Sequence, residues 1–388
     1  MPAAPHASDF VIRHAAWLRL DVGLVALMLA CAGCYTPAVT NPPQGAVDAT
    51  ETLDAAAPGT DAAAPGPDVP KLLPAGDPVE VVVNNDYLSK ALAVIQTAQK
   101  RLDIVQFEAK GGDIIEILVG AVLNAHARGV VVRVLLDDEI ESNKTLIEKF
   151  KAAGMQAKLD VSSVRTHAKL ISSEQAFLLG STNWSQTSIT LNNEANVLVR
   201  DDKSRDTLGK WFDALWTSTS KPVKVALSTS KVAAVYSDTG YEAVVGPLLD
   251  KAAKRIQLVV YQMNSDTSDP TSPVAKTLAR LKAAAKRGVQ VQVILDLSGA
   301  WSEQGNVLNK EAAALLASYG ADVRFDPVDK ITHAKFILID DTFVLGTNNW
   351  GYGGFMLYHE AGLRSSEAKP LATLGAYFDK IWATSKAP

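Results

Sequence analysis

The feature that most constrains the fold of this chain is a long segment that occurs twice. Residues 166–195 align with residues 332–361 at a constant offset of 166 without a gap, and nearly half of the aligned positions are identical. Upstream, residues 128–137 match residues 287–296 at an offset of 159. A chain that repeats itself over such distances is expected to fold as two copies of one structural unit.

Each copy alternates short apolar segments with segments of helical periodicity. Alternating strands and helices favour a layered α/β domain, and two like domains that face each other would bring their repeated segments to one cleft. In the first copy, the pattern predicts strands at 79–83, 102–107, 130–136, 167–172 and 176–179 and helices at 87–101, 114–127, 144–153 and 207–217.

The N-terminal part of the chain, residues 1–75, differs in composition from the rest. Residues 1–34 contain two arginines, an apolar run at 22–33 and then Cys34, a pattern that resembles a bacterial lipoprotein signal. Residues 35–75 are rich in Ala, Pro and Asp and have almost no periodicity, which is typical of a disordered tether. We therefore expect an exported protein that is anchored in the cell envelope through a lipid on Cys34. Secretion without lipidation and a cytoplasmic location are the alternatives.

The formal net charge of −4 lies in the predicted tether. Residues 35–75 hold five acidic residues and one lysine, which leaves equal numbers of basic and acidic residues in residues 76–388. This balance argues against a general nucleic-acid coat, which has a basic excess. The stretch at 217–229, rich in Ser, Thr and Lys, separates two predicted domains, at 76–220 and 230–388.

The repeated segment carries a histidine and a lysine two positions apart, followed by Gly-[Ser/Thr]-x-Asn. On a strand, residues two apart share a face, so each imidazole lies beside an ammonium group. Two copies of this set suit an anionic phosphodiester. One imidazole attacks phosphorus, the other protonates the leaving oxygen, and the lysines stabilise the charge without a metal or cofactor. The candidates are the catalytic His167, Lys169, Asn183, His333, Lys335 and Asn349 and the substrate-binding Ser181 and Thr347.

A histidine nucleophile needs an acceptor on its second ring nitrogen to hold it in one tautomer. Glu194 follows His167 at the same spacing at which Glu360 follows His333. Both glutamates are therefore candidates for this role. His359, which precedes Glu360, is expected either in the cleft or on the surface.

These residues resemble the phospholipase D superfamily, whose mark is two copies of His-x-Lys-x4-Asp followed by Gly-Ser-x-Asn. The resemblance implies two α/β domains, each a mixed sheet flanked by helices, around a shared active site. It also implies a two-step displacement through a phosphohistidine, with His167 as the nucleophile and His333 as the general acid. The acidic position of the motif is Asp340 in the second copy and Glu174 in the first, and we expect both to support the structure, with a salt bridge as one means.

Together these features predict a phospholipase D-type phosphodiesterase that hydrolyses phospholipids, or transfers their headgroups, at a membrane surface. The apolar segment at 351–358, directly after Asn349, would meet lipid chains or form a plain loop. Both motifs lie in one chain, which predicts a monomer. The alternatives are an endonuclease of the same superfamily, a cardiolipin synthase-like phosphatidyl transferase and a lipoprotein without enzymatic activity.

Overall fold

The computed structural model describes residues 72–388, except residues 162, 224, 226, 229 and 299–302. Both repeat copies belong to one compact unit. The predicted signal segment, the candidate lipidation site Cys34 and the tether through residue 71 lie outside the described residues.

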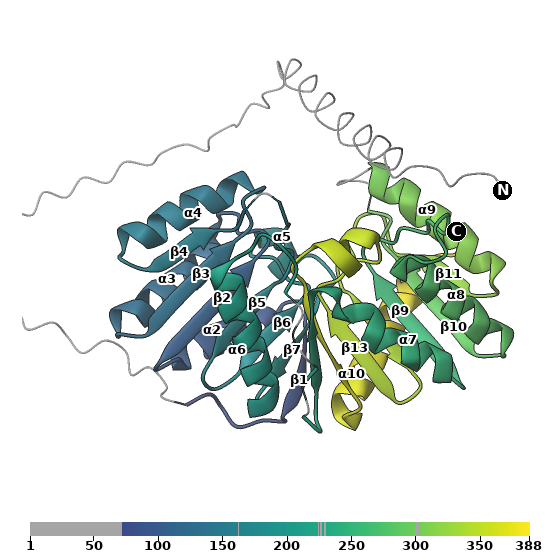
Figure 1. Ribbon diagram of the computed structural model, residues 1–388, viewed down its shortest axis with the longest axis horizontal. Helices are drawn as coiled ribbons and strands as arrows, with labels where there is room; N and C mark the ends of the chain where they lie inside the picture. Colours follow the sequence, from purple (N-terminus) through teal and green to yellow (C-terminus); the bar gives the residue numbers. More distant parts are fainter. Residues whose placement is uncertain (1–71, 162, 224, 226, 229, 299–302) are drawn as a thin grey trace, which may run out of the picture. The chain divides into compact units, whose positions relative to one another are not determined.

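The first repeat copy folds as a mixed sheet of seven strands flanked by helices (Figure 1). Its elements are, in chain order, β1 (Val79–Val83), α2 (Asp86–Thr97), β2 (Arg101–Gln106), α3 (Asp113–Ala127), β3 (Val131–Leu136), α4 (Glu141–Ala152), β4 (Gln156–Leu159), β5 (Leu170–Ser173), β6 (Phe177–Gly180), α5 (Gln186–Thr190), β7 (Ala195–Val199) and α6 (Asp202–Thr217). The strand order is β1-β7-β6-β5-β2-β3-β4. Strands β2, β3 and β4 run parallel, and the other neighbours pair antiparallel.

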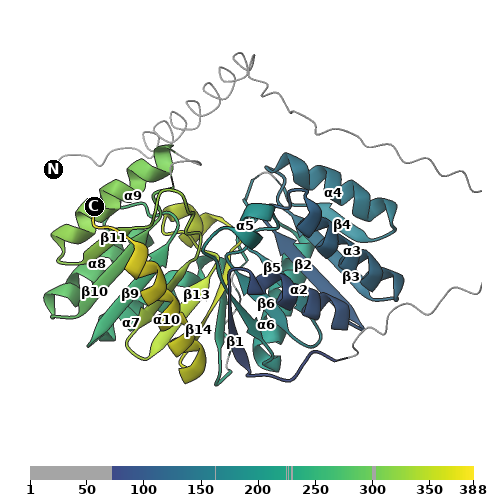
Figure 2. The ribbon, with the colours of Figure 1, turned by 180° about the vertical axis from the view of Figure 1, so that it is seen from behind.

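The second copy repeats this arrangement (Figure 2). Its elements are β8 (Ala234–Ser237), the short helix η1 (Asp238–Gly240), α7 (Tyr241–Lys251), β9 (Arg255–Val260), α8 (Pro273–Lys286), β10 (Gln290–Leu295), α9 (Glu303–Ser318), β11 (Asp322–Phe325), β12 (Phe336–Ile339), β13 (Thr342–Gly346), the π-helix η2 (Gly353–Leu357), β14 (Ala361–Ser365) and α10 (Ala368–Thr384). The strand order β11-β10-β9-β12-β13-β14-β8 is that of the first sheet, strand for strand. The predicted fold of two pseudo-symmetric α/β domains is therefore confirmed.

The two sheets share a hydrophobic core where they meet. One cluster of buried side chains combines Val197 and Trp211 from the first copy with Leu345 and Phe378 from the second. Separate clusters lie under α2, α3 and α4 in one copy and under α7, α8 and α9 in the other. Because separation of the copies would expose the shared cluster to water, we expect the two halves to unfold together.

The strands beside the repeated motif differ from the sequence prediction. The strand expected at 167–172 begins only at Leu170, because the backbone N–H groups of His167 and the next residue donate to the other copy instead of a neighbouring strand. The prediction also omits β4 and β7. Both strands are short, and β4 carries Gln156 and Lys158 in place of an apolar run.

Candidate active site

The two histidine motifs meet where the two copies contact each other. Each motif lies in an extended segment directly before a strand, β5 for His167 and β12 for His333. The backbone N–H groups of His167 and the next residue donate to the carbonyl oxygen of His359 in the second copy, at 3.0 and 2.9 Å. The same two groups at His333 donate to the carbonyl oxygen of Asn193 in the first copy, both at 2.9 Å. Each motif is therefore held by the opposite copy.

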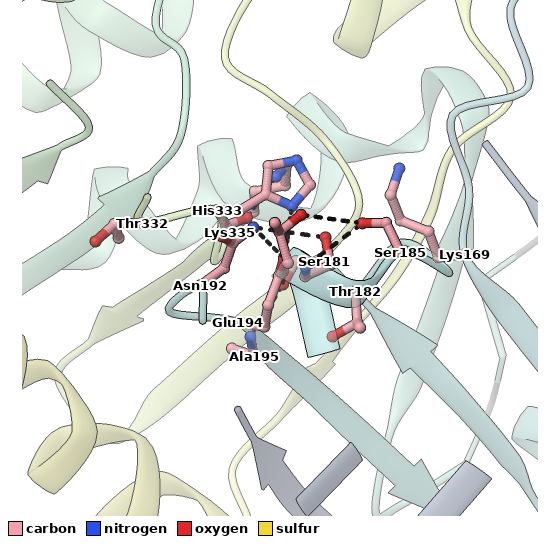
Figure 3. Close-up of polar contacts among 12 residues, drawn as sticks. Lys169, Ser181, Thr182, Ser185, Asn192, Glu194, Ala195, Thr332, His333 and Lys335 are labelled. Carbon is pink, nitrogen blue, oxygen red and sulfur yellow. Dashed lines mark hydrogen bonds and ion pairs between the residues drawn. The ribbon is translucent and has the colours of Figure 1, made fainter. Parts of the chain in front are cut away.

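The two candidate glutamates contact the histidines of the opposite copies. His167 Nδ1 lies 2.9 Å from Glu360 Oε1, and His333 Nδ1 lies 3.1 Å from both carboxylate oxygens of Glu194. Figure 3 shows Glu194 from the first copy beside His333 from the second. The matched spacing in the sequence thus finds the two acceptors but leaves open which histidine each contacts, and in the structure each contacts the histidine of the opposite copy. This arrangement arises because the segments directly before β7 and β14, which carry the glutamates, each contact the histidine motif of the opposite copy.

This contact fixes the tautomer of each imidazole. An ionised carboxylate only accepts hydrogen bonds, so beside an ionised glutamate Nδ1 carries the ring proton and the Nε2 lone pair is left for chemistry. Burial lowers the pKa of His167 well below its ordinary value, and the ammonium groups of Lys169 and Lys335 lower it further. Burial and Lys335 also lower the pKa of His333, against the opposing effect of Glu194. We therefore expect both imidazoles to be neutral near neutral pH in the free protein.

The two glutamates, both fully buried, differ in their ionisation. Burial raises the pKa of Glu360 to about 7, although Lys169 and Thr347 oppose the rise. Burial acts in the same direction on Glu194, but His333 and the neighbouring donors outweigh it and lower its pKa. Near neutral pH, Glu194 is therefore ionised to a greater extent than Glu360, and His333 faces the more fully charged carboxylate.

The hydroxyl groups of Ser181 and Thr347 serve the glutamates. Ser181 Oγ donates to Glu194 Oε2, and Thr347 Oγ1 donates to Glu360 Oε2. Each hydroxyl also accepts a backbone N–H, at 2.9 and 3.0 Å. A hydroxyl has a single proton to donate. These contacts favour a role in orienting the glutamates, whereas the direct binding of substrate by these residues stays a prediction.

Each motif lysine is buried between its own histidine and an aromatic ring. Lys169 Nζ and Lys335 Nζ each donate to the carbonyl oxygen of the histidine two residues earlier. Lys169 Nζ lies 5.1 Å from the ring centre of Phe107, and Lys335 Nζ lies 5.3 Å from that of Tyr261. Burial lowers the pKa of Lys169 to about 8 and that of Lys335 to about 7. An ammonium group has three N–H donors, so two remain for a ligand on each lysine.

Phe107 and Tyr261 are site residues that the sequence prediction missed. Their rings also contact the histidines edge to face, with centres 5.1 Å apart for Phe107 and His167 and 4.8 Å apart for Tyr261 and His333. The two aromatic residues are separated by 154 positions, as are the buried tyrosines Tyr87 and Tyr241. This third constant offset in the sequence, besides 166 and 159, is the signal that would have found them.

A buried asparagine in each copy braces the loop that carries this aromatic residue. Asn143 accepts from Ala109 N and donates to the carbonyl oxygen of Phe107, each at 2.8 Å. Asn309 makes the same pair of contacts with Met263 N and the Tyr261 carbonyl oxygen, also at 2.8 Å. These residues lie 166 positions apart, as the repeat requires.

The candidate asparagines Asn183 and Asn349 follow β6 and β13. Their Oδ1 atoms are buried and have no hydrogen-bond partner among the described residues. Buried polar atoms are almost always paired, so an unpaired acceptor at such a place marks a position where a donor from a ligand or water completes the site. Both amides therefore stay candidates for contact with substrate.

Glu174 and Asp340 lie at the opposite end of the sheets from the histidines. Glu174 accepts from the backbone N–H groups of residues 99–101 at 2.9 to 3.3 Å, and Asp340 accepts from those of residues 253–255 at 2.8 to 3.0 Å. Burial opposes these contacts, but they lower the pKa of both carboxyl groups. Both residues hold the chain at the start of a strand, β2 or β9. This placement supports the expected structural role through backbone bonds rather than a salt bridge.

The surroundings of His167 are more cationic and aromatic than those of His333. The Arg165 guanidinium lies 5.0 Å from the ring centre of Tyr358 and 5.7 Å from that of Phe107. Arg165 also pairs with Glu139. The ring centre of Tyr358 is 6.5 Å from that of His167.

Metal clusters and membrane-spanning helices are both missing from the residues that the structure describes. Within that part of the chain, no group of three or more His, Cys, Asp or Glu side chains is arranged to hold a metal ion. None of the helices there has both the length and the apolar character needed to cross a membrane.

A doubled mixed sheet with paired histidines and lysines between its copies defines the phospholipase D class of proteins. The fold is similar to that of phosphatidylserine synthase from Haemophilus influenzae Rd KW20, with a TM-score of 0.65 over 80% of this chain and 87% of that chain, at 12% sequence identity. This similarity shows a shared fold.

The family model described as "Cardiolipin synthase, PLD-like domain" matches residues 91–216 and 246–382, and the chain belongs to this family. Among curated proteins, the mitochondrial cardiolipin hydrolase of Chlamydomonas reinhardtii is 33% identical over 131 residues, which are 33% of this chain and 57% of that protein. The mitochondrial cardiolipin hydrolase of Homo sapiens is 30% identical over 146 residues, 37% of this chain and 56% of that protein. The chain therefore spans a little over half the length of these relatives.

Proposed function

We propose that the protein is a phospholipase D-type phosphodiesterase that cleaves the phosphodiester of a phospholipid through a phosphohistidine. One observation carries this proposal: His167 and His333, each with Nδ1 on a buried glutamate, have no hydrogen bond on Nε2 among the described residues. The two imidazoles also interact electrostatically with each other and with both motif lysines. The curated relatives, whose names refer to cardiolipin, support a phospholipid as the substrate.

In the first step, the Nε2 lone pair of His167 forms a bond to phosphorus. The bond from phosphorus to the leaving alcohol oxygen breaks, and that oxygen takes the electron pair and a proton from His333 Nε2. The bound phosphodiester anion favours the protonated form of His333, whose Nδ1 faces the carboxylate of Glu194. The lower pKa of His167 keeps that imidazole neutral, as a nucleophile must be. These differences support the order of roles that the resemblance implies.

In the second step, His333 accepts a proton from water while the water oxygen forms a bond to phosphorus. The bond between phosphorus and His167 Nε2 breaks, which releases the phosphate product and restores the imidazole. Lys169 and Lys335 stabilise the charge on the phosphoryl oxygens in both steps. We assign the side-chain NH2 groups of Asn183 and Asn349, as donors, to the same oxygens.

Two exposed leucines support a lipid substrate at a membrane surface. Leu191 and Leu357 are 62% and 48% exposed, and they lie 166 positions apart at matched places in the two copies. In the sequence, each lies between an asparagine and a glutamate of the site: Leu191 directly follows α5, and Leu357 is the last residue of η2. Tyr352, directly before η2, is 51% exposed. Apolar side chains exposed beside a site that binds phosphate suit a substrate with acyl chains.

Phosphatidyl transfer is the second candidate, and the description of the family favours it. An alcohol on a second lipid would then replace water in the second step. The site chemistry is the same for both reactions. The choice between them depends on which acceptor reaches the phosphohistidine first.

The test is an assay of the purified full-length protein on phospholipid vesicles in the presence of EDTA. We expect release of the headgroup alcohol, and production of a second phospholipid when glycerol or phosphatidylglycerol competes with water. The His167→Ala variant is the control for contaminating activity. No turnover on vesicles, together with EDTA-resistant cleavage of plasmid DNA, would replace this function with that of an endonuclease.

Export, a lipid anchor on Cys34 and a monomeric state are further proposals. The apolar run before Cys34 supports the first two, and the presence of both motifs in one chain supports the third. Mass spectrometry of the mature N-terminus tests lipidation. Light scattering of the purified protein tests the oligomeric state.

A further inference from the structure

The two copies differ in the layer of residues next to the glutamates, which consists of Asn84 and Asn193 in the first copy and of Asp238 and His359 in the second. Asn84 in the first copy corresponds to Asp238 in the second, 154 positions later, and both adopt the left-handed backbone conformation, with φ of 49° and 44°. Asn193 corresponds to His359, 166 positions later. The first copy therefore has two neutral amides where the second has a carboxyl group and an imidazole.

In the first copy this layer contains neutral hydrogen bonds. Asn84 Oδ1 accepts from Glu194 N at 2.9 Å and from the Tyr377 hydroxyl at 2.6 Å. The side-chain amide of Asn193 donates across the interface to Thr332 Oγ1 at 2.9 Å. Asn84 thus holds the backbone of Glu194, and Asn193 ties the two copies together.

In the second copy the same layer contains a buried histidine–aspartate pair. His359 Nδ1 lies 3.0 Å from Asp238 Oδ2, and both side chains are fully buried. His359 Nε2 lies 3.0 Å from the carbonyl oxygen of Thr219. Asp238 Oδ1 accepts from Glu360 N at 3.0 Å and from Trp211 Nε1 at 3.2 Å. The pair therefore takes the place that two amides occupy in the first copy.

The partners of His359 define its protonation. A carbonyl oxygen only accepts, so Nε2 carries a proton. Asp238 accepts three other N–H groups, those of Val223, Glu360 and Trp211, so it acts as a carboxylate and Nδ1 carries a proton as well. Burial lowers the pKa of His359, but the bond to Asp238 outweighs it and raises that pKa.

This pair connects three parts of the protein that meet at His167. Thr219 and Val223 belong to the segment between α6 and β8, which joins the two copies. Asp238 holds the backbone of Glu360, whose carboxyl group contacts His167 Nδ1. The His359 carbonyl oxygen accepts the backbone N–H of His167. An asparagine at position 359 is too short to reach both Asp238 and Thr219.

We propose that Asp238 and His359 are positioning residues that fix the His167–Glu360 dyad relative to the segment between α6 and β8. Among the described residues, the His333–Glu194 dyad has no such pair in the corresponding place. On the basis of the proposed function, the pair would matter most when the nucleophile must approach phosphorus. Once the phosphohistidine has formed, the covalent bond itself holds His167. The formation step therefore depends on the pair more than the breakdown step does.

The double variant Asp238→Asn/His359→Asn tests this inference, because it copies the residues of the first half. Asparagine suits the left-handed backbone at 238, as Asn84 shows, and position 359 accepts asparagine at its counterpart, Asn193. The experiment follows rapid-quench formation and decay of the phosphoenzyme with bis(p-nitrophenyl) phosphate. We expect formation to slow roughly 10- to 100-fold. Breakdown should change less than about twofold, and KM should stay within about twofold.

Several outcomes would overturn this inference. They are unchanged formation in the variant, equal slowing of both steps, and a change confined to KM. The variant Trp211→Phe removes one donor to Asp238 but leaves the pair intact, and it should slow formation in the same direction by roughly threefold. This second variant decides the matter if the double variant does not fold, as judged by its circular dichroism. Absence of any phosphoenzyme in the wild-type protein would instead contradict the proposed function.

Discussion

The two histidine dyads are built from the same residue types, yet their surroundings differ. His167 lies near Arg165 and Tyr358, and burial raises the pKa of its partner Glu360 to about 7. His333 lies against Tyr261 alone among the aromatic contacts of the described residues, and its partner Glu194 has a lowered pKa. The two copies supply equivalent sets of groups, and in the proposed mechanism the differences around them separate a neutral nucleophile from a proton donor.

Removal of either imidazole is the largest expected effect. We predict that His167→Ala and His333→Ala each lower kcat on phospholipid by about 10⁵-fold or more, because neither half reaction proceeds without its histidine. With bis(p-nitrophenyl) phosphate, whose leaving group needs no proton, His333→Ala should still form a phosphoenzyme. Intact-mass analysis after quenching measures it. A phosphoenzyme in His167→Ala would assign the nucleophile to the other copy.

Loss of either glutamate, each of which contacts the histidine of the opposite copy, gives the next largest expected effect. We predict that Glu360→Gln and Glu194→Gln each lower kcat on phospholipid roughly 10³- to 10⁴-fold, since an amide allows the wrong tautomer. The dependence of kcat on the pKa of the leaving group separates them. Because Glu194 holds His333, Glu194→Gln should be rescued by a good leaving group, whereas Glu360→Gln should not. The reverse pattern would contradict the observed pairing.

The motif lysines of the two copies can be distinguished by the pH dependence of kcat/KM. Both must be protonated, so kcat/KM should fall as pH rises through the lower of their pKa values, which burial places at about 7 for Lys335 and about 8 for Lys169. Arginine stays protonated throughout this range. We therefore expect Lys335→Arg to move the alkaline limb from about pH 7 to about pH 8, where Lys169 titrates. A limb that does not move would exclude Lys335 as the titrating group.

The exposed leucines give the smallest effect. We predict that Leu191→Ser and Leu357→Ser each lower the rate on phospholipid vesicles by roughly threefold to tenfold and leave the rate on soluble bis(p-nitrophenyl) phosphate unchanged. Val131→Ser is the matched control, because Val131 is 52% exposed at the start of β3, the opposite end of the sheet from the histidines. An equal loss in the control would remove the evidence for a lipid-facing rim.

Much of the fold and the site could be predicted because the repeat can be recognised in the sequence alone, without knowledge of which residues contact each other. The constant offset of 166 aligns His167 with His333 and Glu194 with Glu360, and the alternating pattern predicts most strands and helices. Short strands such as β4 have too few apolar residues to be recognised without their neighbours. The role of Ser181 was also beyond reach, because a hydroxyl beside the motif looks the same whether it faces substrate or Glu194.

By itself, the sequence determined that two equivalent α/β units carry two identical sets of imidazole, ammonium and carboxyl groups. Spacing along one chain cannot say which copy a side chain will contact, because a pseudo-symmetric pair allows both the direct and the exchanged arrangement. Only the tertiary structure decided that Glu360 contacts His167 and that Glu194 contacts His333. The same holds for the Asp238–His359 pair, whose members lie far apart in the sequence. Burial at the contact between the copies brings such residues together, and it also shifts their pKa values.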